Sequence, residues 1–202
     1  MMGVIEKRAK HKEEFRREIL DSAKELFVND GYDKFSMRKL AERIGYSPTT
    51  IYLCFKGKDD LLLAISEEFF GNFWAELNRI RSVSQDPVEA LRKSFIYFME
   101  FGLKNPNQYK VIFFTTSVCG NEEFHQRDSM KQNVLLAFKD MVLDCIKAGR
   151  FRELDEDVIM TSLAVASHGL VTMTLSNPNI ADGKLDIVTR TMVDALFRGY
   201  EK

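Results

Sequence analysis

The side chains best suited to chemistry in this sequence are small hydroxyls and cations near the N-terminus. Ser47, Thr49 and Thr50 surround Pro48 at the start of a short segment, and Lys58 follows it. Hydroxyls and backbone N–H groups in the first turn of a helix can hydrogen-bond phosphates or the edges of bases. The chemistry that this pattern indicates is therefore noncovalent recognition of an anionic polymer.

Covalent chemistry has no comparable pattern in the sequence. The three cysteines (Cys54, Cys119 and Cys145) show no CxxC spacing, and the three histidines do not pair with cysteines or carboxylates at ligand spacing. We find no Ser/His/Asp order, no clear motif of paired carboxylates and no glycine-rich phosphate loop. We therefore expect no enzyme, no metal and no cofactor. Cys54 suggests a redox switch, but a lone cysteine on a packed helix is more often inert.

The composition favours an all-α protein. Hydrophobic residues make up 45% of the 202 residues, and only four prolines interrupt the chain. The net charge is −1, but residues 1–58 hold 13 Lys/Arg against 9 Asp/Glu, so a basic N-terminal part precedes an acidic remainder. An odd number of cysteines, no apolar leader and no membrane-length apolar run predict a cytoplasmic protein that does not contact a membrane.

Apolar spacing and turn residues divide the chain into about nine helices. The expected helices are His11–Asn29, Met37–Ile44, Thr49–Phe55, Asp59–Arg81, Val88–Lys104, Asn107–Thr116, Glu122–Ala148, Glu156–Ser176 and Lys184–Arg198.

The first three of these helices have the punctuation of a helix-turn-helix. Gly31 ends the long supporting helix, Ser36 is an N-cap, and Gly45 separates two short helices. Ser47 caps the second short helix, with Pro48 at its first position. We expect residues 1–58 to form a three-helix domain of this kind, and residues 59–202 to form a helical effector-binding and dimerisation domain.

Residues Ile19 to Ile65 have the sequence ILDSAKELFVNDGYDKFSMRKLAERIGYSPTTIYLCFKGKDDLLLAI. This segment resembles the DNA-binding region of the TetR/AcrR family of bacterial regulators almost without gaps. The resemblance implies a sequence-specific transcriptional regulator, in particular a repressor that a small apolar or amphipathic ligand releases from its operator. It also implies a homodimer on double-stranded DNA with a pseudo-palindromic operator.

The expected DNA contacts combine the hydroxyl-rich helix start with positions that the resemblance adds. They are Ser36, Arg38, Ser47, Pro48, Thr49, Thr50, Tyr52 and Lys58. Two alternatives stay open: the serines only cap helices, or Tyr52 packs and Arg38 belongs to a solvated face. Leu53 and Cys54 depart from the family pattern, which predicts reliance on Arg38, Thr49 and Thr50 or readout of DNA shape.

The basic residues 7–12 are expected either as a disordered arm that enters a minor groove or as a solvated terminus. A rival interpretation of the whole chain is a ligand-binding or interaction protein that has weak DNA binding or has lost it. The departures at Leu53 and Cys54 favour that rival.

The last two helices carry small residues and an apolar stripe, which the resemblance assigns to a four-helix dimer interface. The predicted interface residues are Leu163, Ala166, Leu170, Met173, Val188, Met192, Leu196 and Phe197. The alternative is that this stripe belongs to the core of one chain.

Residues 88–148 are rich in Phe and Met, and they predict an apolar cavity for an effector of unknown identity. The predicted pocket residues are Phe95, Phe98, Met99, Tyr109, Phe113, Phe114, Phe138, Met141 and His168. The alternative is that these side chains are ordinary core. The resemblance implies that the ligand displaces the helix Asp59–Arg81. This displacement would change the spacing between the two helix-turn-helix domains (residues 1–58, called the heads) of the dimer.

Overall fold

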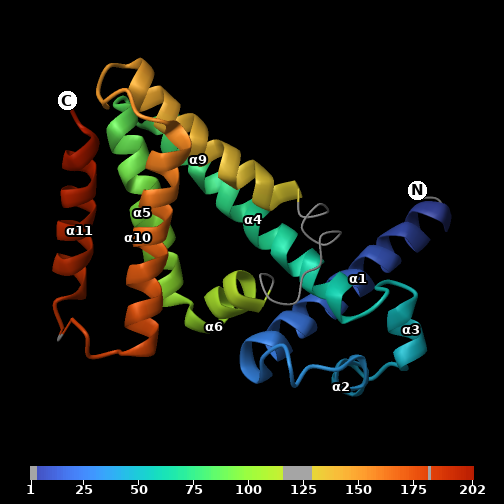
Figure 1. Cartoon of the computed structure of the whole chain (residues 1–202). Helices are drawn as coiled ribbons and strands as arrows, with labels where there is room; N and C mark the ends of the chain where they lie inside the picture. Colours follow the sequence, from blue (N-terminus) through green and yellow to red (C-terminus); the bar gives the residue numbers. More distant parts are fainter. Residues whose placement is uncertain (1–3, 116–128, 182) are drawn as a thin grey trace. The chain divides into compact units, whose positions relative to one another are not determined.

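The computed structural model describes residues 4–115, 129–181 and 183–202. In these ranges the chain is built from α-helices and contains no strand (Figure 1), which confirms the all-α prediction. Cys119 and the expected helix start at Glu122 lie outside the described residues.

The described helices agree with the expected ones in number and order. They are α1 (Val4–Asp30), α2 (Met37–Ile44), α3 (Pro48–Tyr52), α4 (Lys58–Val83), α5 (Pro87–Lys104), α6 (Pro106–Tyr109), α9 (Ser129–Lys147), α10 (Glu156–Ser176) and α11 (Leu185–Tyr200). A π-helical segment, Lys110–Thr115, follows α6 directly.

The first helix begins earlier than the sequence pattern indicated, so of the two alternatives for residues 7–12 the structure has the solvated terminus, as a helix, and not the disordered arm. Helix α1 already includes these residues. They face solvent and have no apolar stripe, but they are mostly strong helix formers, and Lys10 forms an i,i+4 ion pair with Glu14. Local helix propensity therefore continues the helix where no burial requires it.

The chain forms two compact units, which we describe separately. Unit 1 comprises Met1–Phe69 and Asn107–Ser129, and unit 2 comprises Phe70–Pro106 and Met130–Lys202. The helix α4 contributes its first part to unit 1 and its second part to unit 2. The division of the chain at residue 58 into two functional domains stays a prediction.

The core of unit 1 joins the three helices of the helix-turn-helix. Ile19 of α1, Leu40 of α2 and Ile51 of α3 are fully buried. The ring of Phe27 stacks on that of Phe35 with centroids 4.2 Å apart, which closes the turn between α1 and α2. These contacts fix the two short helices on the long one.

The core of unit 2 is centred on α5, which packs against both α10 and α11. Leu91 and Met99 of α5 are fully buried, as is Val171 of α10. The Arg92 guanidinium lies over the Phe197 ring, 4.7 Å from its centroid, and also pairs with Asp194. Helix α11 is thereby fixed on α5 by apolar, cation–π and ionic contacts.

Helix α10 is strongly apolar, although one of its sides faces solvent. Its best 18-residue window has a mean hydropathy of 1.6, so by length and composition it could cross a membrane. A single helix that passes this test is weak evidence for a membrane span. Val158, Val165 and Met173 lie exposed along one side of it, and the other side packs on α5.

His168 is the one described histidine of unit 2, and its ring contacts Phe98 edge-on with centroids 4.7 Å apart. Burial lowers the pKa of His168, and the positive charge of Lys131 lowers it further. The neutral imidazole is therefore the form that the folded chain favours.

This lowered pKa predicts a loss of stability at acidic pH. As the pH falls through the ordinary histidine pKa near about 6.5, the unfolded chain takes up a proton more readily than the folded chain. We expect the urea-unfolding free energy to fall more between pH 7.5 and 5.5 in the wild type than in His168→Gln or His168→Phe. An equal fall in all three proteins would contradict this assignment.

Candidate nucleic-acid interface

The first short helix of the head, α2, has a side-chain cap at its start and a left-handed cap at its end. The Ser36 Oγ accepts a hydrogen bond from the backbone N–H of Lys39 at 3.2 Å. Gly45 follows the helix with φ of 73°, a conformation that favours glycine. The sequence predicted both caps, and α3 begins three residues after Gly45.

The second short helix, α3, presents its first turn to solvent. The Ser47 Oγ accepts a hydrogen bond from the Thr50 backbone N–H at 3.2 Å, and it lies 2.8 Å from the Thr50 hydroxyl oxygen. Pro48, Thr49 and Tyr52 are exposed. The N-terminal turn therefore offers hydroxyl, apolar and aromatic groups together, as a helix that enters a major groove requires.

The start of α4 supplies a further cation, beside the connection between α1 and α2. The Lys58 ammonium lies over the Tyr32 ring, 3.6 Å from its centroid. The Tyr32 hydroxyl donates a hydrogen bond to Asp59, and the Lys56 backbone N–H donates to the Asp60 carboxylate at 3.1 Å. The position of Lys58 is therefore fixed by an aromatic contact that the sequence pattern did not predict.

The cations of α2 are paired with carboxylates on the surface. Arg38, whose side chain is 84% exposed, donates to Glu42 at 3.0 Å. Arg43 pairs with Glu25 of α1. Exposed pairs of this kind contribute about 0–1 kcal/mol, so a phosphate can replace Glu42 as the partner of Arg38 at little cost.

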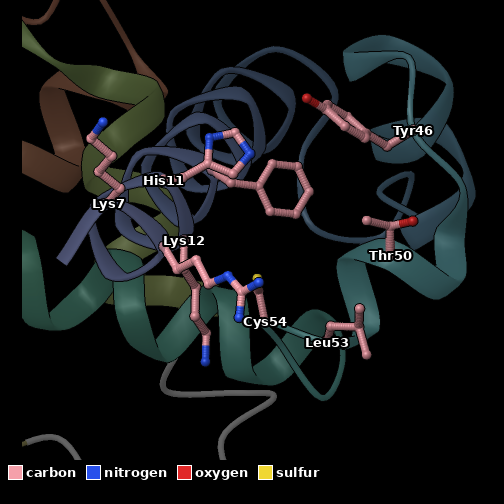
Figure 2. A pocket seen from close by; sticks show the side chains of 9 residues that line it. Lys7, His11, Lys12, Tyr46, Thr50, Leu53 and Cys54 are labelled. Atoms are coloured by element: carbon pink, nitrogen blue, oxygen red, sulfur yellow. The ribbon is translucent and has the colours of Figure 1, made fainter. Parts of the chain in front are cut away.

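An open groove of about 720 Å³ lies between α1 and α3, and no pattern in the sequence predicts it. Figure 2 shows Lys7, His11 and Lys12 on one side and Tyr46, Thr50 and Leu53 on the other. The lining is Lys7, Arg8, His11, Lys12, Phe15, Tyr46, Thr50, Leu53 and Cys54. Hydroxyl and charge spacing could not reveal it, because it depends on how α1 lies against α3.

The predicted effector-pocket residues fall into two groups. Phe95, Phe98, Met99, Phe138, Met141 and His168 belong to unit 2, and Tyr109, Phe113 and Phe114 belong to unit 1. In unit 2 the rings of Phe95 and Phe138 lie 4.6 Å apart, and in unit 1 those of Tyr109 and Phe113 lie 4.8 Å apart. Phe114 is exposed, whereas most of the others are buried.

The predicted dimer-interface residues also divide by exposure. Leu163 and Phe197 are buried within the chain itself, so these two positions are core and cannot face a second copy. Met173 and Val188 are exposed. Ala166, Leu170, Met192 and Leu196 are partly exposed.

Comparison with known proteins gives a match in the head. Residues 19–65 match the model of the family described as bacterial regulatory proteins, tetR family. An uncharacterized HTH-type transcriptional regulator of Haemophilus influenzae is 27% identical over 154 residues, which are 73% of this chain and 76% of that protein. The fatty acid metabolism regulator protein of Bacillus subtilis is 38% identical over 56 residues, but these are only 28% of this chain and 29% of that protein.

Solved structures share the fold over nearly the whole chain. FadR from Bacillus subtilis in complex with stearoyl-CoA matches with a TM-score of 0.78 and 22% identity, covering 92% of this chain and 99% of that one. FadR from Bacillus halodurans matches with a TM-score of 0.76 and 19% identity, covering 91% and 95%. Residues 19–65 therefore match the tetR family of bacterial regulatory proteins, and the described chain has the same fold as these solved structures.

Proposed function

We propose that the protein is a repressor that binds a pseudo-palindromic operator as a homodimer and leaves it when a small amphipathic molecule binds the body. The observation that carries the proposal is the exposed first turn of α3. Its hydroxyls and Tyr52 face solvent while Ile51, in the same helix, is fully buried. A helix held from one side with polar groups on the other is arranged to read a major groove.

Ser47 has a structural role that must be separated from a role in binding DNA. Its hydroxyl caps α3 by accepting from the Thr50 N–H, and an alanine there would remove the cap at a cost of about 1 kcal/mol. Aspartate caps a helix as well as serine does, but it brings a negative charge to the DNA-facing turn. The two substitutions therefore separate folding from binding.

We expect Ser47→Asp to keep the wild-type unfolding free energy and to lose operator binding, because its carboxylate repels phosphates. The measurement is an electrophoretic shift with a duplex selected from random DNA by the wild-type protein, together with urea unfolding. Ser82→Asp, which adds the same charge at an exposed position of unit 2, is the control and should bind as the wild type does. Wild-type affinity of Ser47→Asp would reduce Ser47 to a cap.

The exposed apolar side of α10 and α11 supports the homodimer. Val165 of α10 is 65% exposed, and Ile187 of α11 is 63% exposed. Gly169 lies on the exposed side of α10 and allows close approach of a second helix. A second copy of the chain would cover this apolar side, and it would also explain the high hydropathy of α10 without a membrane.

We expect Val165→Asp to convert the dimer into a monomer, because a dimer would bury the new carboxylate without a partner. Val83, at the end of α4, is also 65% exposed, so Val83→Asp is a matched control that should leave the dimer intact. Light scattering after size-exclusion chromatography measures both. A dimeric Val165→Asp protein would place the interface elsewhere.

Helix α4 provides a route by which an effector could move the head. In the first half of α4, Glu68 accepts from Lys24 of α1 at 2.6 Å and from Arg17 of α1 at 3.3 Å. Near its end, Arg81 donates to Asp144 of α9 at 2.5 Å. Since α4 contacts α1 through its first half and α9 near its end, a ligand that shifts α4 would act on the head.

The Phe- and Met-rich core of unit 2 supports an apolar part in the effector, and the similar fold of a FadR bound to stearoyl-CoA suggests the first probe. We expect stearoyl-CoA to raise the melting temperature and to weaken operator binding by about 5–150-fold, the usual range of allosteric coupling. Coenzyme A without an acyl chain is the control. Unchanged operator affinity at saturating stearoyl-CoA would exclude this effector.

The rival function is an interaction protein of the same fold that has lost DNA binding. Leu53, which is 77% exposed where the family pattern has a polar or aromatic residue, favours it. Failure of the wild type to select any sequence from random DNA would support the rival and overturn the repressor.

A further inference from the structure

The basic stripe of α1 faces the groove of Figure 2 and has no role in the contacts assigned above. Lys7, Arg8, His11 and Lys12 recur one helical turn apart, so they share one face of α1. All four are exposed and line the groove between α1 and α3. The groove therefore has one wall with several cations.

The charge of this groove is of one sign. No acidic side chain is among the described residues that line it. The neighbouring Lys10 pairs with Glu14 at 3.8 Å, and both lie outside the lining. The cations turned toward the groove are thus separated from the carboxylates of the same helix, which favours an anionic occupant.

The opposite wall is apolar and belongs to the reading head. Leu53 and Tyr46 are 77% and 43% exposed, and the Tyr46 ring contacts that of Phe15 edge-on with centroids 4.7 Å apart. Thr50 of α3 lines the groove as well. An occupant of the groove therefore meets cations on one side and the recognition helix on the other.

A polymer fits this arrangement better than a small molecule. Sites for small molecules bury about 70–90% of the ligand's surface, whereas the cations of this groove are all exposed. Phosphates of a duplex stay partly solvated when lysine and arginine neutralise them, and the deoxyribose between them is apolar enough to contact a leucine.

We propose that the groove holds the sugar-phosphate backbone of one operator strand, with the basic face of α1 on its phosphates and Leu53 against its sugars. The proposal rests on the DNA binding proposed above and adds α1 to the contact surface. It also gives Leu53, which has little to offer a base edge, a sequence-independent contact.

The test is the salt dependence of binding to duplex DNA in the double variant Arg8→Ala/Lys12→Ala. Each phosphate contact contributes about 0.9 to the slope of log affinity against log salt concentration, so we expect the slope to fall by about 1.8 per protomer. The fall should be the same for the selected operator and for an unrelated duplex, because the backbone carries no direct sequence information.

The control is Lys104→Ala/Arg152→Ala, which removes one lysine and one arginine from exposed positions of unit 2, away from the groove. This variant should keep the wild-type slope. Circular dichroism and thermal unfolding of both variants check that α1 remains folded. Leu53→Ala should weaken binding to both duplexes while leaving the slope unchanged, because it removes an apolar contact and no charge.

Three outcomes would overturn the proposal. If Arg8→Ala/Lys12→Ala kept the wild-type salt slope, Arg8 and Lys12 would not contact phosphates, and the proposal would fail. The proposed function would still stand if the wild-type protein bound its operator. A fall confined to the operator would assign the cations to sequence or shape readout. Loss of stearoyl-CoA binding in the double variant, with the slope kept, would make the groove a site for an amphipathic anion.

Discussion

The exposed first turn of α3 depends on the burial of Ile51 and Phe55, because α3 is too short to be stable alone. A five-residue helix cannot offset the cost of nucleation in water. Ile51 and Phe55 hold α3 and its C-terminal end in the core of unit 1. The Arg16 guanidinium lies 4.1 Å from the centre of the Phe55 ring and donates to the Cys54 carbonyl at 2.9 Å. Removal of these anchors would disperse the exposed hydroxyls, whatever their identity.

The same separation of a fixed side and an exposed side recurs in α10. Ile159 and Val171 are buried, and helix α10 packs on α5, whereas Val158 and Val165 face outward. In α3 the exposed first turn carries hydroxyls, which suit the proposed contact with DNA, and in α10 the exposed side is apolar, which suits the proposed second copy. The chemistry of the uncovered side therefore distinguishes the two kinds of recognition, although both helices are held by similar burial.

Features set by neighbouring residues could be predicted from the sequence, and features set by distant ones could not. Ser36, Gly45 and Ser47 act over three or four residues, so their caps follow from local rules. The contact of Lys58 with the Tyr32 ring and the α1–α3 groove depend on tertiary packing. Periodicity alone also cannot tell an inward from an outward apolar residue on α10, which is why Leu163 was assigned to the wrong side.

The departures at Leu53 and Cys54 shift the physical basis of recognition. Leu53 has an apolar side chain and Cys54 is half-buried, so the two residues that follow α3 offer little to the polar edge of a base. Under the proposed function, base contacts would come from the first turn of α3 and from Tyr52. A head with few base contacts and many cations gains affinity mainly from counterion release, which discriminates poorly between sequences. If the protein binds its operator as the proposed dimer, we expect specificity to come from operator shape and from the spacing that the dimer imposes on its two heads.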